Sequence, residues 1–308
     1  MSSSHPRTLD PKLDVVFKLL FADQRNRPLL ISLLSAVLQP KQPIREAEVL
    51  NPKIERETLA EKGAVLDIRV QLQDGRQVDV EMQVAPHPGL RERVLYYWAR
   101  LYVAQLHPGD LHTQLQPVVG VFIANFRELP DERFHSTFRL LEVHSQRSFS
   151  EALQLHFLEL PKLPSPSDVE SPDPSEAAVL KWGRFLAAQS DQELTRLAMT
   201  DSDLRAAKAA LDRLSADPEA QRLAEERRLA VWNHERTIHL SRAEGHAEGR
   251  IEGRAEGRIE GRVEGRAEGE SALRQAVRAL CEVLEIPLTP DREQALVAEL
   301  RTQRAWPD

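Results

Sequence analysis

Residues 66–84, LDIRVQLQDGRQVDVEMQV, decide the fold of this chain because they predict a two-stranded antiparallel hairpin. Apolar and polar side chains alternate with a period of two on both sides of Asp74 and Gly75, as in strands that bury one face. A two-residue turn at Asp74 and Gly75 would set apolar positions of one strand against polar positions of the other. A three-residue loop, 73–75 with Gly75 in the left-handed conformation, aligns both faces, and we expect that register.

This register places two carboxylates side by side. On the buried face the expected pairs are Leu66 with Met82, Ile68 with Val80, and Val70 with Val78. On the other face Asp67 lies opposite Glu81, with their Cβ atoms about 5 Å apart. Like charges at that distance repel unless a cation lies between them, and carboxylate oxygens suit a hard cation such as Mg²⁺. The same alternation also fits an ordinary solvated hairpin face, so spacing alone leaves both interpretations open.

Five short segments follow one another in order along the chain. They are LDPKLDVVFKLLF at 9–21, VLNPKI at 49–54, VDVEMQ at 78–83, RERVLYYWARLYVAQL at 91–106 and QPVVGVFIANF at 116–126. Across residues 9–163 they resemble the PD-(D/E)xK nuclease superfamily and, more narrowly, the Rpn-type recombination-promoting nucleases, a PD-(D/E)xK family of transposases. The resemblance implies a restriction-endonuclease-like core, a DNA substrate and phosphodiester hydrolysis with Mg²⁺, or else Mn²⁺ or Ca²⁺, as the cofactor.

The resemblance also assigns roles within the hairpin. Asp67 and Glu81 would bind the metal, and the backbone carbonyl of Met82 would be a further ligand. Gln83 would occupy the position at which the superfamily carries a lysine. Gln is usual in this subfamily, but a neutral amide can orient a water molecule and cannot supply positive charge to the transition state.

Another cation is therefore expected near the site. Lys18, in the first expected helix, and Lys62, five residues before Asp67, are the two candidates. We rank Lys18 first because the resemblance places that helix beside the site. An ordinary surface lysine is the alternative for both residues.

The distribution of charge bears on DNA as a partner. The net charge of −7 argues against it, because binding to DNA depends on Lys and Arg that neutralise phosphates. Residues 1–163, however, contain 20 Lys+Arg and 20 Asp+Glu, so the whole acidic excess lies in 164–308. Arg91, Arg93 and Arg100 follow the hairpin in an expected helix, where Arg93 and Arg100 share a face. We expect these three to contact the phosphate backbone; pairing with nearby acidic residues is the alternative.

Composition sets limits on the class of protein. A chain of 308 residues with 41% hydrophobic and 29% charged residues is typical of a soluble globular protein. No apolar run approaches the length of a membrane span, and the N-terminus lacks the features of a secretory signal. The single cysteine, Cys281, excludes an intramolecular disulfide and a Cys-based zinc site. We expect a cytoplasmic, bacterial protein without a membrane partner.

The order of expected elements predicts an α+β fold. Residues 10–38 are expected to be helical with a break at Pro28, 44–50 to form a strand before the hairpin, and 90–106 to form the next helix. Residues 117–126 are continuously apolar, as in a strand buried on both faces, and weaker strand signals follow at 134–143 and 153–160. The sum is an α/β sandwich with the two carboxylates at one edge of the sheet.

Beyond this nuclease-like domain at 1–163, the composition changes several times. We expect a Pro/Ser/acidic linker at 164–176, an α-helical module at 177–240, a tetrad-repeat helix at 241–270 and short C-terminal helices at 271–308.

A four-residue repeat, AEGH-AEGR-IEGR-AEGR-IEGR-VEGR-AEGE, fills residues 243–270 and holds seven of the 13 glycines. On an α-helix each tetrad drifts by about 40°, so like residues form slowly winding rows. Each Gly costs about 1 kcal/mol relative to Ala in a helix, and the i,i+4 neighbours carry like charges. Either partner helices stabilise this segment or it is largely flexible. We expect homo-oligomerisation through 241–270, and proteins of the family that this chain resembles often carry similar repeats.

Three hypotheses on function follow. The chain is a divalent-metal-dependent DNA endonuclease, linked by the resemblance to recombination or mobile elements. Alternatively, it keeps the nuclease fold without strong activity and acts as an oligomeric DNA-binding or scaffolding protein. In the third hypothesis it is mainly an interaction module organised by its tetrad helix.

Overall fold

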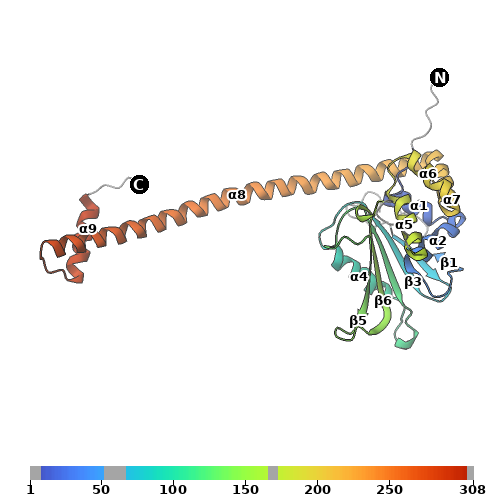
Figure 1. The fold of residues 1–308 in the computed structure, drawn as a ribbon, viewed down its shortest axis with the longest axis horizontal. Helices are drawn as coiled ribbons and strands as arrows, with labels where there is room; N and C mark the ends of the chain where they lie inside the picture. The colour runs from blue at the N-terminus through green and yellow to red at the C-terminus, as the bar shows by residue number, and fades with distance from the viewer. Residues whose placement is uncertain (1–7, 52–66, 166–172, 304–308) are drawn as a thin grey trace, which may run out of the picture. The chain divides into compact units, whose positions relative to one another are not determined.

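The computed structural model describes residues 8–51, 67–165 and 173–303 (Figure 1). Its centre is a six-stranded mixed sheet in the order β1-β2-β3-β4-β6-β5. The strands are β1 (Ala47–Val49), β2 (Asp67–Leu72), β3 (Gln77–Gln83), β4 (Val118–Ala124), β5 (His135–Leu141) and β6 (Ser148–Glu159). Strands β3, β4 and β6 run parallel, while β1–β2, β2–β3 and β5–β6 are antiparallel pairs. The expected α+β class is confirmed.

The hairpin has the expected register. Asp67 pairs with Glu81, Ile68 with Val80, and Val70 with Val78. Gly75 has a φ of 85°, a conformation that residues with a Cβ rarely adopt, and it closes the loop by donating its N–H to the carbonyl of Leu72. Leu66 lies outside the described residues. The side chain of Asp67 is also outside the described part, and the β2–β3 pairing gives the position of its backbone.

The first helical segment is divided differently from the expectation. It forms α1 (Asp14–Phe21), a short 3-10 turn η1 (Gln24–Asn26) and α2 (Arg27–Leu38). Pro28 lies in the first turn of α2 and does not interrupt a helix, because the first turn needs no N–H donor from that residue. The break falls instead at residues 22–26, where the Asp23 side chain accepts from the Arg25 N–H and caps η1.

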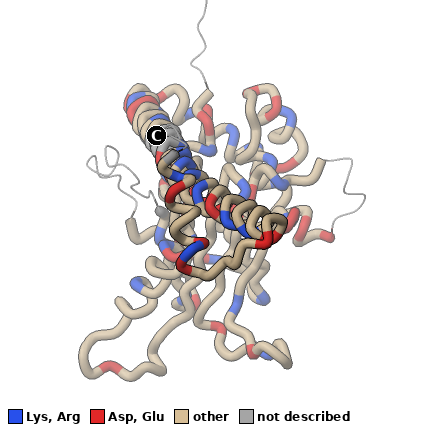
Figure 2. Tube along the Cα trace, turned by 90° about the vertical axis from the view of Figure 1, so that its left-hand side faces the viewer, with Lys and Arg blue, Asp and Glu red and all other residues tan. Residues whose placement is uncertain are grey.

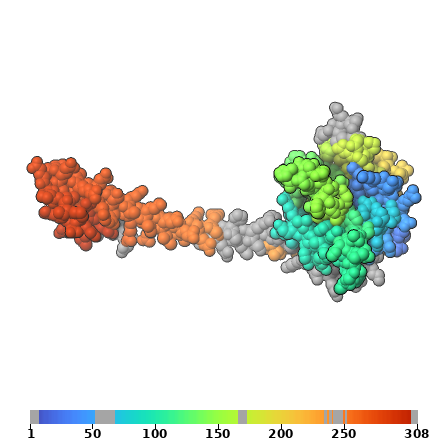
Figure 3. All heavy atoms as spheres, turned by 90° about the horizontal axis from the view of Figure 1, so that it is seen from below, coloured from blue at the N-terminus to red at the C-terminus, as the bar shows by residue number. Residues whose placement is uncertain are grey.

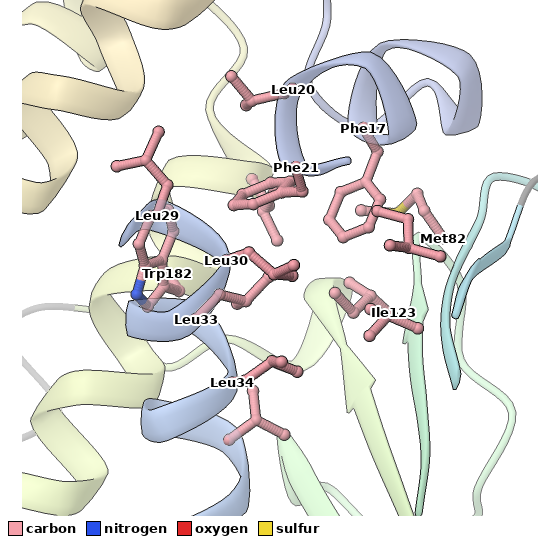
Figure 4. Close-up of a cluster of buried hydrophobic side chains, with 14 of the residues drawn as sticks. Phe17, Leu20, Phe21, Leu29, Leu30, Leu33, Leu34, Met82, Ile123 and Trp182 are labelled. Carbon is pink, nitrogen blue, oxygen red and sulfur yellow. The ribbon is translucent and has the colours of Figure 1, made fainter. Parts of the chain in front are cut away.

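Two hydrophobic clusters lie on opposite faces of the sheet. The larger one joins the sheet to α1 and α2, and Figure 4 shows Phe17 of α1 beside Met82 and Ile123, with Leu30 and Leu33 of α2 next to them. The smaller one lies under α4 (Leu90–Val103), where Leu90 and Val94 pack near Phe122 and Phe157. Because strand side chains alternate, β3 directs Val80 and Met82 to the first face and Glu81 to the second.

The expected helical module at 177–240 does not have a core of its own. It forms α5 (Pro174–Ala187), α6 (Asp191–Thr200), α7 (Ser202–Ala216) and the start of α8. Trp182 and Phe185 belong to the same cluster as Phe17 and Phe21, and the rings of Phe21 and Trp182 are 5.6 Å apart. The first compact unit therefore runs from Met1 to Arg236, so the change in composition after residue 163 does not separate two cores.

The second compact unit comprises Thr237–Asp308. The repeat lies within α8 (Pro218–Val283), and α9 (Pro290–Gln303) follows it. Basic and acidic positions alternate along α8 (Figure 2). The segment expected as a separate terminal helix after residue 271 is the end of α8, which packs on α9 through Val277, Cys281 and Val297. In Figure 3 the red atoms of this C-terminal part form one compact group. Within the described part of the chain, none of the helices combines the length and apolarity that a membrane crossing needs.

Candidate active site

Glu81 lies on an inner strand of the sheet. Strand β3 runs between antiparallel β2 and parallel β4, and the backbone of Asp67 faces that of Glu81 across the β2–β3 pair. The expectation of an edge position is therefore wrong for Glu81, because residues 118–124 add a parallel strand on the far side of β3. The Glu81 side chain is only 2% exposed, so its carboxylate needs charge compensation inside the protein.

That compensation comes from α4. The Nη2 atom of Arg93 lies 2.8 Å from Oε1 of Glu81, in an ion pair whose arginine side chain is 14% exposed. The side-chain amide of Gln83 donates to the same Oε1 atom. Gln83 can reach it because residues two apart on a strand project from the same face. Gln83 and Arg93, both partly exposed, thus form one polar cluster with the buried Glu81 carboxylate.

The position of Arg93 depends on how α4 docks. The helix begins after Gly89, which has a φ of 72°, and Leu90 and Val94 bury its inner side against the smaller cluster. One helical turn later Trp98 donates its indole N–H to the carbonyl of Val118 at 3.0 Å, which fixes α4 to β4. These contacts hold the residue before Val94, Arg93, over β3.

The other two arginines predicted to bind DNA lie on the outer side of α4. Arg91 pairs with Glu128 through Nε at 2.8 Å, with more than half of its side chain exposed. Arg100 is exposed and its guanidinium lies 5.7 Å from the centre of the Tyr96 ring. The structure therefore separates the three: Arg93 contacts a buried carboxylate, while Arg91 and Arg100 face the surface.

Lys18 is 4% exposed, so the surface interpretation of this residue is wrong. It lies on α1, which contacts β2 and β3 on the face that receives Met82. The alternative candidate, Lys62, falls outside the described residues. Met82 buries its side chain in the larger cluster, and its predicted role rests on its backbone carbonyl alone.

A second buried ion pair, which the sequence did not suggest, lies at the carboxyl ends of the parallel strands. Glu159 ends β6 in register with Ala124 and Gln83, and its Oε2 is 2.6 Å from Nζ of Lys162. Its Oε1 accepts from the backbone N–H groups of Glu128 and Leu129. This pair fixes the loop that carries Glu128, the partner of Arg91. In the sequence, only the spacing of Glu159 and Lys162 in the stretch 159–162 could have indicated this ion pair.

The Glu81 carboxylate is one oxygen donor that a hard cation could use. Within the described residues there is no group of three or more His, Cys, Asp or Glu side chains that could hold a metal. A site here would combine the Glu81 carboxylate with oxygen donors that include Asp67, whose side chain is not described. The Glu81 carboxylate is held in place by two N–H donors, and carboxylate and carbonyl oxygens are the ligands that Mg²⁺ prefers.

Comparison with known proteins places these elements in a family. The family model described as PD-(D/E)XK nuclease family transposase matches residues 11–241, a span that includes α1, the hairpin, α4 and α5 to α7. No curated protein and no solved structure matches the chain. The family match extends over well over half of the 308 residues. The chain therefore belongs to the PD-(D/E)XK nuclease family transposases.

Proposed function

We propose that this protein is a divalent-metal-dependent DNA endonuclease. The observation that carries the proposal is the buried Glu81 carboxylate, which faces the Asp67 position across the hairpin and receives hydrogen bonds from Gln83 and Arg93. Buried charges are costly and persist where they are paired or bind metals. A site of this kind on a chain of the nuclease family supports phosphodiester hydrolysis.

Each residue has a proposed task. Asp67, Glu81 and the Met82 carbonyl would hold Mg²⁺, or Mn²⁺ or Ca²⁺ in its place. The metal supplies Lewis acidity and lowers the pKa of bound water. Gln83 orients the attacking water with its side-chain amide, and Lys18 remains a candidate cation from α1. Arg91 and Arg100, both exposed on α4, bind the phosphate backbone.

The remaining parts of the proposal concern assembly and biological role. We assign homo-oligomerisation to the repeat at 241–270, where the described glycines 249, 253, 257, 261, 265 and 269 leave room for a close partner helix. Cleavage of DNA by such an oligomer would serve recombination or the movement of genetic elements, in line with the transposase family.

The second candidate function is non-catalytic DNA binding or scaffolding. Gln83 favours it, because the neutral side chain stands where the superfamily signature places a lysine. The two candidates differ in one respect that can be measured: both predict binding to DNA, and only the nuclease predicts metal-dependent cleavage.

The test is nicking of supercoiled plasmid by the purified full chain with Mg²⁺, Mn²⁺, Ca²⁺ or EDTA. The variants are Asp67→Asn and Glu81→Gln, which remove charge with little change of shape, and the control is Asp74→Asn in the exposed loop of the same hairpin. We expect nicking in wild type and Asp74→Asn, and none in the two site variants, with folding verified by circular dichroism. DNA binding without nicking in any metal would favour the scaffold. Loss of binding or nicking on deletion of 241–270 alone would favour the interaction module.

A further inference from the structure

The geometry of α4 points to Arg93 as the catalytic cation that Gln83 cannot provide. We propose that its guanidinium binds a non-bridging oxygen of the scissile phosphate and stabilises the charge that develops there. This inference rests on the proposed nuclease function and goes beyond it, since it moves Arg93 from the general phosphate-binding surface into the reaction centre.

Arg93 and Gln83 meet at one atom. Both side chains donate to Oε1 of Glu81, so the guanidinium and the end of the side chain at position 83 are grouped around one carboxylate oxygen. A lysine at position 83 would bring its ammonium group to the same region. Arg93 brings positive charge to that region from a helix instead of from the strand.

The Nε atom of Arg93 is a second donor near this carboxylate. This atom is buried and has no hydrogen-bond partner among the described residues. The contrast is Arg227, which binds Asp14 with both Nε and Nη2. A buried N–H of a charged group is costly without an acceptor, so an oxyanion that reached Nε would gain a strong hydrogen bond. Arginine binds phosphate through two parallel N–H donors, and Nε is available for that purpose here.

The sheet explains why Arg93 fits the role better than Lys18. Glu81 projects to the face covered by α4, opposite the face to which β3 directs Val80 and Met82. Lys18 is on α1. The residue before it in that helix, Phe17, packs beside Met82 on that opposite face (Figure 4). Arg93 therefore lies on the same face as the carboxylate, whereas α1, which carries Lys18, covers the opposite face.

The chemistry of arginine limits what it can do. A guanidinium does not lose its proton in proteins, so Arg93 cannot act as a general base. Its contribution is electrostatic: donors fixed in a water-poor site stabilise negative charge that grows on the phosphate oxygens. α4 is fixed by Leu90, Val94 and Trp98, which keeps this donor in place before substrate arrives.

The experiment uses the full chain with Arg93→Gln and Arg93→Lys, and Arg127→Gln as the matched control. Arg127 is an exposed arginine that pairs with Glu132 and has no part in the site. In single-turnover cleavage at saturating DNA we expect Arg93→Gln to lose about a hundredfold to a thousandfold in rate, the cost of one removed transition-state donor. Arg93→Lys should retain part of the rate because it keeps the charge. Arg127→Gln should match wild type.

Rescue separates a catalytic role from a structural one. Adding Gln83→Lys to Arg93→Gln restores a lysine at the superfamily position, and we expect cleavage to return. A purely structural Arg93 would not be replaced by a lysine on the strand. Unchanged cleavage in Arg93→Gln, or a lost rate that Gln83→Lys does not restore in the folded double variant, would overturn the inference.

A binding readout does not depend on cleavage. Inorganic phosphate should raise the melting temperature of wild type and of Arg127→Gln, and should not raise that of Arg93→Gln. An equal rise in all three would show that the Nε donor does not receive an oxyanion.

If wild type cleaves and Glu81→Gln does not, while Arg93→Gln cleaves normally, only the inference on Arg93 fails. Absence of cleavage by wild type with every metal would reject the nuclease function itself.

Discussion

The buried ion pair between Asp14 and Arg227 should carry a large share of the stability of the first compact unit. It joins the first residue of α1 to α8, 213 positions away in sequence, through Nε contacts of 3.0 Å and 2.8 Å to the two carboxylate oxygens. The Asp14 and Arg227 side chains are 6% and 8% exposed. Replacing Arg227 by Ala leaves the Asp14 carboxylate buried without this partner.

The expected magnitude follows from that burial. Removal of one partner of a buried ion pair costs about 3–5 kcal/mol of unfolding free energy, because the remaining charge is desolvated without compensation. In a unit of this size each kcal/mol lowers the melting temperature by about 2–4 °C. Arg227→Ala should therefore lower it by roughly 6–20 °C. Asp14→Ala should have an effect of similar size.

Urea unfolding followed by tryptophan fluorescence measures the effect, since Trp182 is fully buried in the same core. The control is Arg222→Ala, which removes an exposed arginine of α8 paired with Glu219 and Glu226 and should leave stability unchanged. The double variant should be much less destabilised than the sum of the two single variants, because the pair is one energetic unit. Additive effects, or single variants as stable as Arg222→Ala, would refute a compensated pair at this position.

Four further predictions concern three glycines and a buried histidine. Gly183→Ala should lower the free energy of unfolding by about 1–3 kcal/mol, because the new methyl carbon would lie 2.5 Å from Phe134 and 2.8 Å from Leu163. Gly257→Ala in the repeat meets no atom of another element within 4 Å and, in the monomeric chain at high dilution, should stabilise its helix by about 1 kcal/mol, so thermal melts of the two variants should shift in opposite directions. Gly75→Ala should cost about 1–2 kcal/mol in urea titrations because of the positive φ, and no loss would show that the loop adopts another turn. Burial lowers the pKa of His156 from 6.5 to about 3, with the nearby charges of His135 and Arg139 as smaller causes. The unfolded chain therefore takes up a proton that the folded chain does not, so stability should fall as the pH drops from 6.5 towards 3, and His156→Gln should flatten the melting temperature over that window. An unchanged slope in the variant would assign the acid sensitivity to other groups.

The hairpin shows how much local sequence determines. The period-two alternation and the position of Gly75 specified one register, and the pairs of Asp67 with Glu81 and Ile68 with Val80 confirm it. A shift of one residue would have turned every apolar side chain to the wrong face, so the alternation in the sequence is enough to predict the register. The buried strand at 118–124 was predictable for the same reason, because a continuous apolar run has no solvated face.

The helices show where sequence patterns were not sufficient. Composition after residue 163 suggested a separate module, but the apolar faces of α5 and α7 are buried against α1 and α2. The ring N–H of Trp182 donates to the hydroxyl of Ser32, 150 positions earlier in the sequence. A helical periodicity predicts that one face is buried and carries no information on which partner buries it.

In the candidate site, too, some features follow from the local sequence and others depend on tertiary packing. The sequence by itself determined that Asp67, Glu81 and Gln83 share one face of a hairpin, because strand geometry links neighbours by alternation and pairing. Only the tertiary structure decided that Glu81 is buried, that Lys18 is inside and that Arg93 reaches the carboxylate while Arg91 and Arg100 do not. The physical reason is that charge compensation depends on distances of a few ångströms between elements, and those distances are set by the docking of α4 on the sheet through Leu90, Val94 and Trp98.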